Sequence, residues 1–187
     1  KKTRYLILSV DFLLWPENKT PLIAHYPGIQ EELNGDLSPK KIAEAIKKIR
    51  TSKLPDSDQL PNIGSFFQNP RIKASLVEKI KKRFPQMPEF EKTYLSSKVS
   101  AAWLIDKTNF KGYKIGDAGV YKKHSLILVN HGHATPNDVL KLAQKIQKTI
   151  HNKFGIWLIP EPSIISSFEK TASSLMSPRN QTYIPHN

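Results

Sequence analysis

The feature of the sequence that constrains the fold most is one long amphipathic helix whose start and stop are both encoded. Thr135-Pro136-Asn137-Asp138 is a capping box, in which the threonine and the aspartate satisfy each other's backbone N–H groups. Gly155 stands where helices commonly end in a left-handed residue. Apolar residues three or four positions apart share one face of this helix: Val139, Leu142, Ala143, Ile146 and Ile150. The rest of the fold must therefore cover this face.

The remaining pattern predicts an α+β fold. Short apolar strands are expected before and after the long helix, at residues 125–130 and 156–159. Further helices are predicted from the Ser38 cap to about Arg50, from Ala74 to Arg83, and from Ser97 to Asp106. Helices and strands alternate only in part, and no glycine-rich strand-to-helix phosphate loop is present, which argues against a Rossmann or Walker fold.

The N-terminal segment is apolar enough to predict a strand that is buried on both faces. Tyr5 to Phe12 is this strand, and Val10–Leu14 with Thr20–His25 flanks a turn-like segment and gives a hairpin-like opening. The chain has 187 residues, of which 39% are apolar, and this suits one domain or one domain and part of another. A strand that is apolar on both faces requires neighbouring elements on both sides, which suggests that the sequence starts inside a larger fold.

The charge balance favours anionic partners. Lys and Arg outnumber Asp and Glu by 29 to 16, and the resulting net charge of +13 attracts nucleic acid, anionic lipid or phosphorylated metabolites. Most lysines fall on predicted helices, so we interpret them as solvated helix faces. The absence of cysteine excludes disulfides and thiol chemistry and fits a reducing compartment. Because no apolar run is long enough to span a membrane and no secretion pattern is evident, we expect a cytoplasmic protein.

A serine in the long connection from Thr51 to Pro70 is the first candidate for chemistry. Compact domains usually reserve structureless connections of this length for function. Ser65 follows Gly64, whose lack of a side chain permits close approach of a ligand, and Phe66 and Phe67 can anchor the loop by burying apolar area. The alternative is that Ser65 is only a helix cap or a turn residue.

Three more polar residues are candidates for an anionic or partly buried site. Lys53 and Asn69 lie on the same loop and can both reach a phosphate, the lysine as a point charge and the asparagine as a neutral donor. Glu161 stands between two prolines at the end of a predicted strand, where its carboxyl could be partly desolvated. For each of them the alternative is an ordinary exposed side chain.

Two other functional classes need to be weighed. Three histidines invite a metal interpretation: His124, His131 and His133. They span a strand end and a turn, and no carboxylate or cysteine shares their spacing, so no metal site is predicted. A nucleic-acid-binding module would use the positive charge, with Phe66, Phe67 and Trp103 as stacking groups. This alternative lacks any alternation of aromatic and basic residues on one element.

Five sequence blocks, taken in order, resemble one enzyme family. They are Arg50-Thr-Ser-Lys53-Leu-Pro-Asp56, Gly64-Ser-Phe-Phe-Gln-Asn-Pro70, Ser100-Ala-Ala-Trp-Leu-Ile-Asp106 with Lys111-Gly-Tyr-Lys-Ile-Gly116, Ser125-Leu-Ile-Leu-Val-Asn130, and Phe154-Gly-Ile-Trp-Leu-Ile-Pro-Glu161. This pattern resembles the C-terminal part of the type I bacterial UDP-N-acetylenolpyruvoylglucosamine reductases, also called UDP-N-acetylmuramate dehydrogenases, which are flavoenzymes of peptidoglycan precursor synthesis. The resemblance spans nearly the whole chain.

The resemblance implies a two-step reduction. NADPH reduces FAD, and hydride then passes to the enolpyruvyl double bond of a UDP-sugar substrate, whose adjacent carbon receives a proton. Ser65 matches the residue that gives this proton, and Glu161 matches the carboxyl that stabilises the enol-like intermediate. Tyr26, Lys53 and Asn69 match positions that hold the UDP diphosphate. His124 stands in the substrate site where these enzymes carry glutamine, so a neutral ligand contact becomes titratable.

The departures from the family pattern concern the flavin. No diphosphate-binding segment for FAD and no arginine partner for the catalytic carboxyl can be found, so the FAD site is not expected in this chain. After Glu161 the family's Val-Arg-Phe is replaced by Pro162-Ser163-Ile164, which puts the pairing of the last strand in question. The expected division is a remnant of the flavin domain at 1–40, a substrate-binding α+β domain at 41–155, and a returning strand with a tail at 156–187.

The chain by itself is therefore expected to bind substrate without catalysing the reaction. Its missing partner would be the N-terminal FAD-binding portion of the reductase. A third possibility beside the reductase and the nucleic-acid module is an inactive remnant, in which the site residues survive only because the fold does.

Overall fold

The computed structural model describes residues 7–14, 16 and 24–164, and its longest element is helix α5 (Pro136–Phe154). The capping box at its start is confirmed: the Thr135 amide donates to Asp138 Oδ2 at 3.0 Å, and the Asp138 amide donates to Thr135 Oγ1 at 3.3 Å. Gly155 ends the helix with φ 71°, in the left-handed region that glycine tolerates. Both boundaries match the sequence prediction because the side chains that set them are local to the helix.

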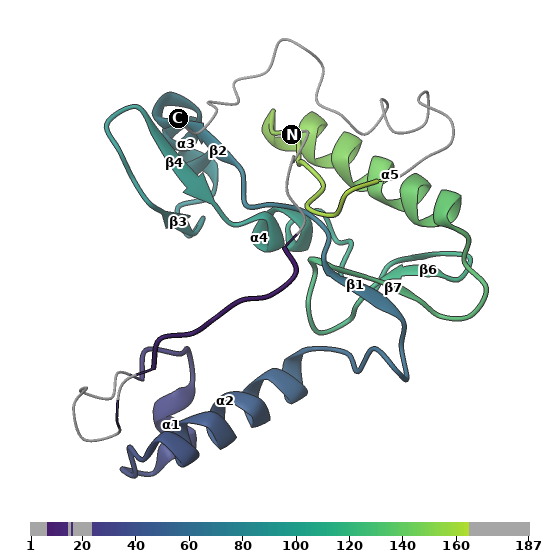
Figure 1. The fold of residues 1–187 in the computed structure, drawn as a ribbon. Helices are drawn as coiled ribbons and strands as arrows, with labels where there is room; N and C mark the ends of the chain where they lie inside the picture. Colours follow the sequence, from purple (N-terminus) through teal and green to yellow (C-terminus); the bar gives the residue numbers. More distant parts are fainter. Residues whose placement is uncertain (1–6, 15, 17–23, 165–187) are drawn as a thin grey trace. The chain divides into compact units, whose positions relative to one another are not determined.

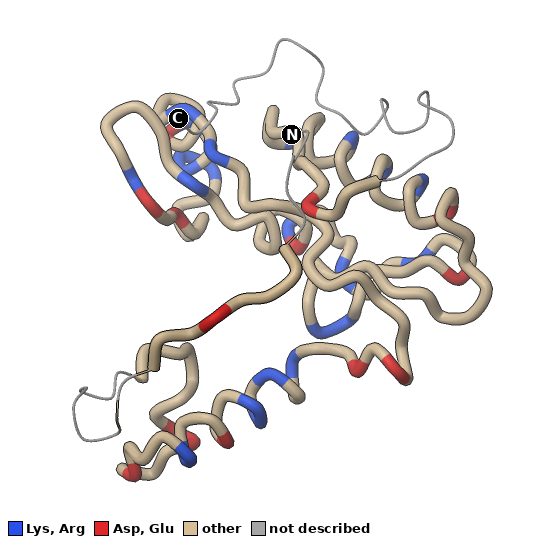
Figure 2. The backbone as a smooth tube through the Cα atoms, viewed as in Figure 1, with Lys and Arg blue, Asp and Glu red and all other residues tan. Residues whose placement is uncertain are grey.

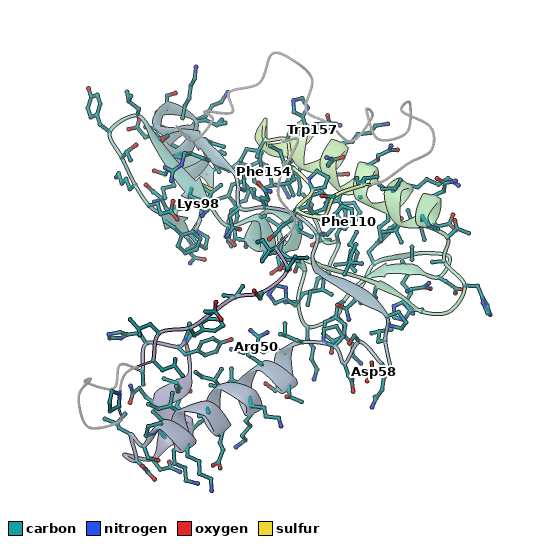
Figure 3. The ribbon with its side chains drawn as sticks, in the orientation of Figure 1. Arg50, Asp58, Lys98, Phe110, Phe154 and Trp157 are labelled. Atoms are coloured by element: carbon teal, nitrogen blue, oxygen red, sulfur yellow. The ribbon has the colours of Figure 1, made fainter. Side chains whose placement is uncertain are left out.

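The apolar face of α5 packs against an antiparallel sheet in the unit that comprises residues 53–187 (Figure 1). The strand order is β1-β7-β6-β5, formed by β1 (Asn62–Ser65), β7 (Ile127–Asn130), β6 (Ala118–Val120) and β5 (Lys114–Ile115). Leu142, Ile146 and Ile150 are fully buried in a core that also holds Phe110 and Phe154 (Figure 3). Burial of this face, rather than helix propensity alone, stabilises the helix.

A smaller sheet precedes α5 in the chain. Its order is β2-β4-β3, from β2 (Arg71–Lys73), β4 (Ser96–Val99) and β3 (Glu89–Phe90), and α3 (Ala74–Arg83) packs on β2 and β4. The predicted helix at 97–106 is wrong in its first part, because residues 96–99 form β4 and only α4 (Ala101–Asp106) is helical. Pairing with β2 on one side and β3 on the other overrides the local preference.

The other compact unit comprises residues 1–52 and is built from α1 (Ile29–Leu33) and α2 (Pro39–Lys53). Ala45 and Ile49 of α2 are buried with Ile29 and Leu33 of α1. This unit ends after Ser52, and α2 packs on α1 within it. The assignment of these segments to a flavin-side and a substrate domain stays a prediction.

The hairpin-like opening falls largely outside the described residues. Residues 17–23 are not described, and residues 7–14 form no strand. Their apolar side chains are exposed, with Leu8 at 87% and Leu13 at 89%. In the part of the chain that the structure describes, no helix has the length and apolar content needed to cross a membrane.

The segment after α5 is extended but forms no regular strand. Ile156 and Leu158 are buried, and a single antiparallel bridge pairs Phe67 with Pro160. The prediction of a strand at 156–159 is therefore wrong in its form. Proline has no N–H to donate, and Pro160 and Pro162 prevent the ladder from continuing.

Candidate functional site

Three segments that carry candidate residues lie side by side through backbone hydrogen bonds. The Phe66 amide donates to the carbonyl oxygen of Leu126 at 2.8 Å, and the Glu161 amide donates to the carbonyl oxygen of Phe66 at 2.8 Å. Phe66 directly follows Ser65, and Leu126 lies two residues after His124. The tertiary structure thus brings Ser65, Glu161 and His124, which are far apart in the sequence, onto neighbouring segments of one unit.

Ser65 is the last residue of β1, where the strand is irregular. Gly64 has φ 66°, and the register of β1 against β7 shifts between Asn62 and Ser65. The Gly64 amide donates to Asn62 Oδ1 at 3.0 Å, which holds the bulge in place. Ser65 is exposed, caps no helix, and makes no side-chain hydrogen bond to another described residue. Its hydroxyl is available to a ligand.

Phe66 and Phe67 hold this loop, as the sequence predicted. Their exposed fractions are 2% and 1%, and their rings meet edge to face with centroids 4.9 Å apart. Because both rings are buried in the same core cluster, the backbone that carries Ser65 is held in place. Because both rings are buried, neither can stack on a base, which contradicts the role that the nucleic-acid alternative gave them.

Glu161 is exposed, so the expected partial desolvation of its carboxyl is wrong for the described residues. Only its backbone is fixed, through the bond to Phe66 and the adjacent bridge at Pro160. Its carboxylate makes no ion pair with another described residue. The flanking prolines restrict the backbone without covering the side chain.

Asn69 has a structural partner that the sequence did not reveal. Its Oδ1 accepts from the Ala101 amide at 2.9 Å, beside the Ser100 cap at the start of α4. An N–H donor on this side sets the amide orientation, so Nδ2 remains a donor that faces away from Ala101. A local cap and a ligand contact can therefore coexist in one side chain.

His124 is half-buried in the turn before β7. Burial, followed by the nearby Lys111, lowers its pKa, whereas Asp106 acts in the opposite direction. Asp106 also accepts a hydrogen bond from Ser125 Oγ. Sequence reasoning missed this pair, because a serine inside a predicted strand and an aspartate 19 positions earlier carry no joint signal.

The two remaining candidates, Lys53 and Tyr26, lie at the start of the second unit and in the first unit, respectively. Lys53 is the exposed last residue of α2. Tyr26 is half-buried in the first unit, where it packs on the cluster of α1 and α2, and its backbone carbonyl oxygen accepts from the Ile29 amide at 3.0 Å. Ser65 and the other candidates lie in the second unit.

Among the described residues, neither the basic side chains nor the histidines are gathered at one site. Lys and Arg are distributed over α2, α3, α5 and the turn before β7 rather than in one block (Figure 2). The His133 amide donates to Asp117 Oδ2 at 2.8 Å, but among the described residues no group of three or more His, Cys, Asp or Glu could hold a metal ion.

A cavity of about 520 Å³ adjoins the segments of Ser65 and Glu161. Its wall includes Ile63 and Phe66, on either side of Ser65, and Pro162, which follows Glu161. Leu128 and Val139 contribute to its apolar lining. Asn62, Asn130 and Asn137 add polar groups to this mostly apolar lining, whereas Ser65 and Glu161 lie next to lining residues in the chain and are not part of it.

Comparison with known proteins places this domain. Residues 55–165 match the family model described as UDP-N-acetylenolpyruvoylglucosamine reductase, C-terminal domain. The UDP-N-acetylenolpyruvoylglucosamine reductase of Chromobacterium violaceum is 41% identical over 166 residues, which cover 87% of this chain and 48% of the relative. That of Buchnera aphidicola is 46% identical over 135 residues, with 72% and 39% covered. The chain spans about half the length of the Chromobacterium relative.

A solved structure is also similar. The UDP-N-acetylenolpyruvylglucosamine reductase of Thermus caldophilus is 27% identical, and the match covers 58% of this chain and 29% of that chain with a TM-score of 0.37.

Proposed function

Because the chain belongs to the UDP-N-acetylenolpyruvoylglucosamine reductase family through its C-terminal domain, we propose that it supplies the substrate-binding and proton-donating part of such a reductase. The reaction would convert UDP-N-acetylenolpyruvoylglucosamine to UDP-N-acetylmuramate for peptidoglycan synthesis in the cytoplasm. The observation that supports this proposal most is the pair of backbone bonds that joins the segments of Ser65, His124 and Glu161.

The chain's own residues divide into those that bind and those that act on the double bond. Lys53 contributes a positive charge to the diphosphate, and Asn69 contributes a neutral N–H donor. Tyr26 and His124 complete the set of substrate contacts. Binding of the nucleotide end then positions the enolpyruvyl group, and such positioning can supply much of the rate.

Ser65 would deliver the proton. An aliphatic hydroxyl is a poor acid in water, but one held within hydrogen-bond reach can protonate a strongly basic carbanion. The carboxyl of Glu161 would stabilise the enol-like intermediate on the substrate. This carboxyl is exposed in the structure, so the proposed role requires that bound substrate and the rest of the reductase cover it during the reaction.

FAD and NADPH would supply the hydride in the complete enzyme. No residue of this chain is assigned to either, since the sequence contains no glycine-rich phosphate-binding segment. We therefore expect the chain alone to bind UDP-sugar weakly, to bind no FAD and to be inactive. A stoichiometric yellow flavin in the purified protein would contradict this.

Substrate binding is tested by calorimetric titration of the full chain with UDP-N-acetylglucosamine. Lys53→Ala should weaken binding by about tenfold, because it removes a charge-assisted contact. Lys148→Ala removes the same charge from an exposed position on α5 and should leave the affinity unchanged. Steep, salt-dependent binding of single-stranded RNA without UDP-sugar binding would support the nucleic-acid alternative instead.

Proton donation is tested in a complete enzyme. A chimera joins the N-terminal half of the Chromobacterium violaceum reductase to this chain, and NADPH oxidation is measured with the enolpyruvyl substrate. Ser65→Ala should lower the rate by about 10²- to 10⁴-fold, while the flavin stays bound. An active chimera that is indifferent to this substitution would refute the role of Ser65, and an inactive one with bound flavin would support an inactive remnant.

A further inference from the structure

A second recess, of about 330 Å³, is lined by α3 and the C-terminal end of α5. Its apolar wall consists of four side chains: Leu76, Ile80, Phe84 and Phe154. Among the described residues, none lines both this recess and the cavity beside Ile63. Its volume lies at the lower end of the range for small-molecule pockets, so the recess suits a compact ligand.

Four basic side chains line the same recess, although most basic residues of the chain are dispersed. They are Lys79 and Arg83 of α3, and His151 and Lys153 of α5. No described lining residue is Asp or Glu, and within the described part of the chain the two lysines and the arginine make no ion pair. A concave surface lined by charge of one sign attracts small ions of the opposite sign.

Aromatic rings contact two of these cations. Arg83 Cζ lies 5.5 Å from the centroid of the Phe84 ring, and Lys153 Nζ lies 5.7 Å from the centroid of Phe154 and 5.9 Å from that of Phe84. Cation–π contacts of this kind are attractive. Lys153 Nζ also donates to the carbonyl oxygen of Lys107. An ammonium group has three N–H donors, so Lys153 keeps donors for a ligand.

Stabilisation of helix ends does not by itself account for this arrangement. Basic side chains in the last turn of a helix interact favourably with its free carbonyl groups, and Arg83 and Lys153 occupy such positions. Lys79 lies before the last turn of α3, yet it lines the recess as well. Lys153 donates to a carbonyl oxygen outside its own helix. The basic side chains are thus arranged around the recess rather than around one helix end.

We propose that this recess binds a soluble phosphate monoester with an aromatic or other apolar body. A phosphate offers three acceptor oxygens to Lys79, Arg83 and Lys153, and a guanidinium can donate two N–H groups to one phosphate. The apolar body packs against Phe84 and Phe154. This inference concerns a second site and does not rest on the proposed reductase function.

Calorimetric titration of the full chain with 1-naphthyl phosphate at low salt tests the proposal. Inorganic phosphate and 1-naphthol each carry only one of the two features, so both should bind more weakly than the ester. Lys79→Ala and Arg83→Ala should each weaken binding of the ester by about fivefold, the size expected for a partly exposed ion pair. Lys82→Ala removes the same charge from an exposed position in the last turn of α3 that does not line the recess, and it should leave the affinity unchanged.

Trp103 reports whether the ester occupies the recess. The centroid of its ring lies 5.7 Å from that of Phe84 and 5.9 Å from that of Phe154. The indole N–H signal of Trp103 in ¹H–¹⁵N spectra, assigned with Trp103→Phe, should therefore shift as the ester is added. Circular dichroism confirms that each variant is folded.

The outcomes separate this inference from the proposed function. Equal affinity of the wild type and both recess variants for the ester, or inorganic phosphate that binds as tightly as the ester, would overturn the proposal. If Lys53→Ala rather than Arg83→Ala weakens binding, the ester occupies the proposed substrate site and the inference fails. Binding to vesicles that contain phosphatidic acid, without binding of the ester, would overturn the assignment to a soluble ligand. The recess variants should bind UDP-N-acetylglucosamine as the wild type does, so either proposal can fail while the other stands.

Discussion

Asn69 allows the structural and the ligand-binding role of one side chain to be separated. Its Oδ1 accepts from the Ala101 amide at 2.9 Å, whereas its Nδ2 is the atom proposed to reach the diphosphate. Asn69→Ala removes both functions. Asn69→Asp keeps an acceptor for Ala101 and removes only the donor, so the two substitutions should affect stability and binding differently.

The expected loss of unfolding free energy follows from the role of Asn69 in capping α4. Truncating a side chain that accepts from an N-terminal helix amide costs about 1 kcal/mol of unfolding free energy. With a urea m-value of about 2 kcal/mol per M, Asn69→Ala should lower the unfolding midpoint by about 0.5 M. Asn69→Asp should leave the midpoint unchanged or raise it, because a negative charge is favourable at the start of α4.

Urea unfolding followed by tryptophan fluorescence measures this directly. In a Trp15→Phe background the signal comes from Trp103, which is in α4 itself, and from Trp157, both in the second unit. Both substitutions should weaken UDP-N-acetylglucosamine binding by about tenfold or more. An equal loss of stability in the two variants would refute the cap, and undiminished binding by Asn69→Asp would refute the ligand contact.

Three further predictions concern the framework of the site. Gly64→Ala should cost about 1 kcal/mol and Gly64→Asn less, since an added Cβ meets no atom within 4 Å and only the positive φ resists it; equal urea midpoints would contradict this. Leu104→Ala, at a fully buried position, should cost about 2–5 kcal/mol, and Leu104→Met under about 1.5; similar midpoints for both would argue against tight packing. Hydrogen bonds from Lys81 and, to a smaller extent, from Ser97 lower the pKa of Glu89 in the folded protein. These bonds stabilise the fold fully above the pKa of an unfolded glutamate, about 4.3, and the stabilisation should be lost as the pH falls from there through the lower folded pKa. Glu89→Gln should flatten this acid loss of the midpoint, and an unchanged slope would refute it.

The local chemistry of the sequence determined the helices that carry their own signals. The boundaries of α3 and α5 match the predictions, and α5 does so because the Thr135 cap, Pro136 and Gly155 act within a few residues of each end. The α+β class also follows from the pattern, since few short strands lie among these helices. The anchoring by Phe66 and Phe67 was predictable from their apolar area alone.

Only the tertiary structure decided the short strands and the composition of the site. Ser96–Val99 is a strand because it lies between β2 and β3, and nothing within the segment itself encodes that pairing. The exposure of Glu161, the contact of Asn69 with Ala101 and the hydrogen bond of Ser125 to Asp106 depend on segments that are remote from one another in the sequence. Helix caps act over a few residues and can be read along the chain, whereas strand partners and side-chain burial are fixed only when distant segments pack together.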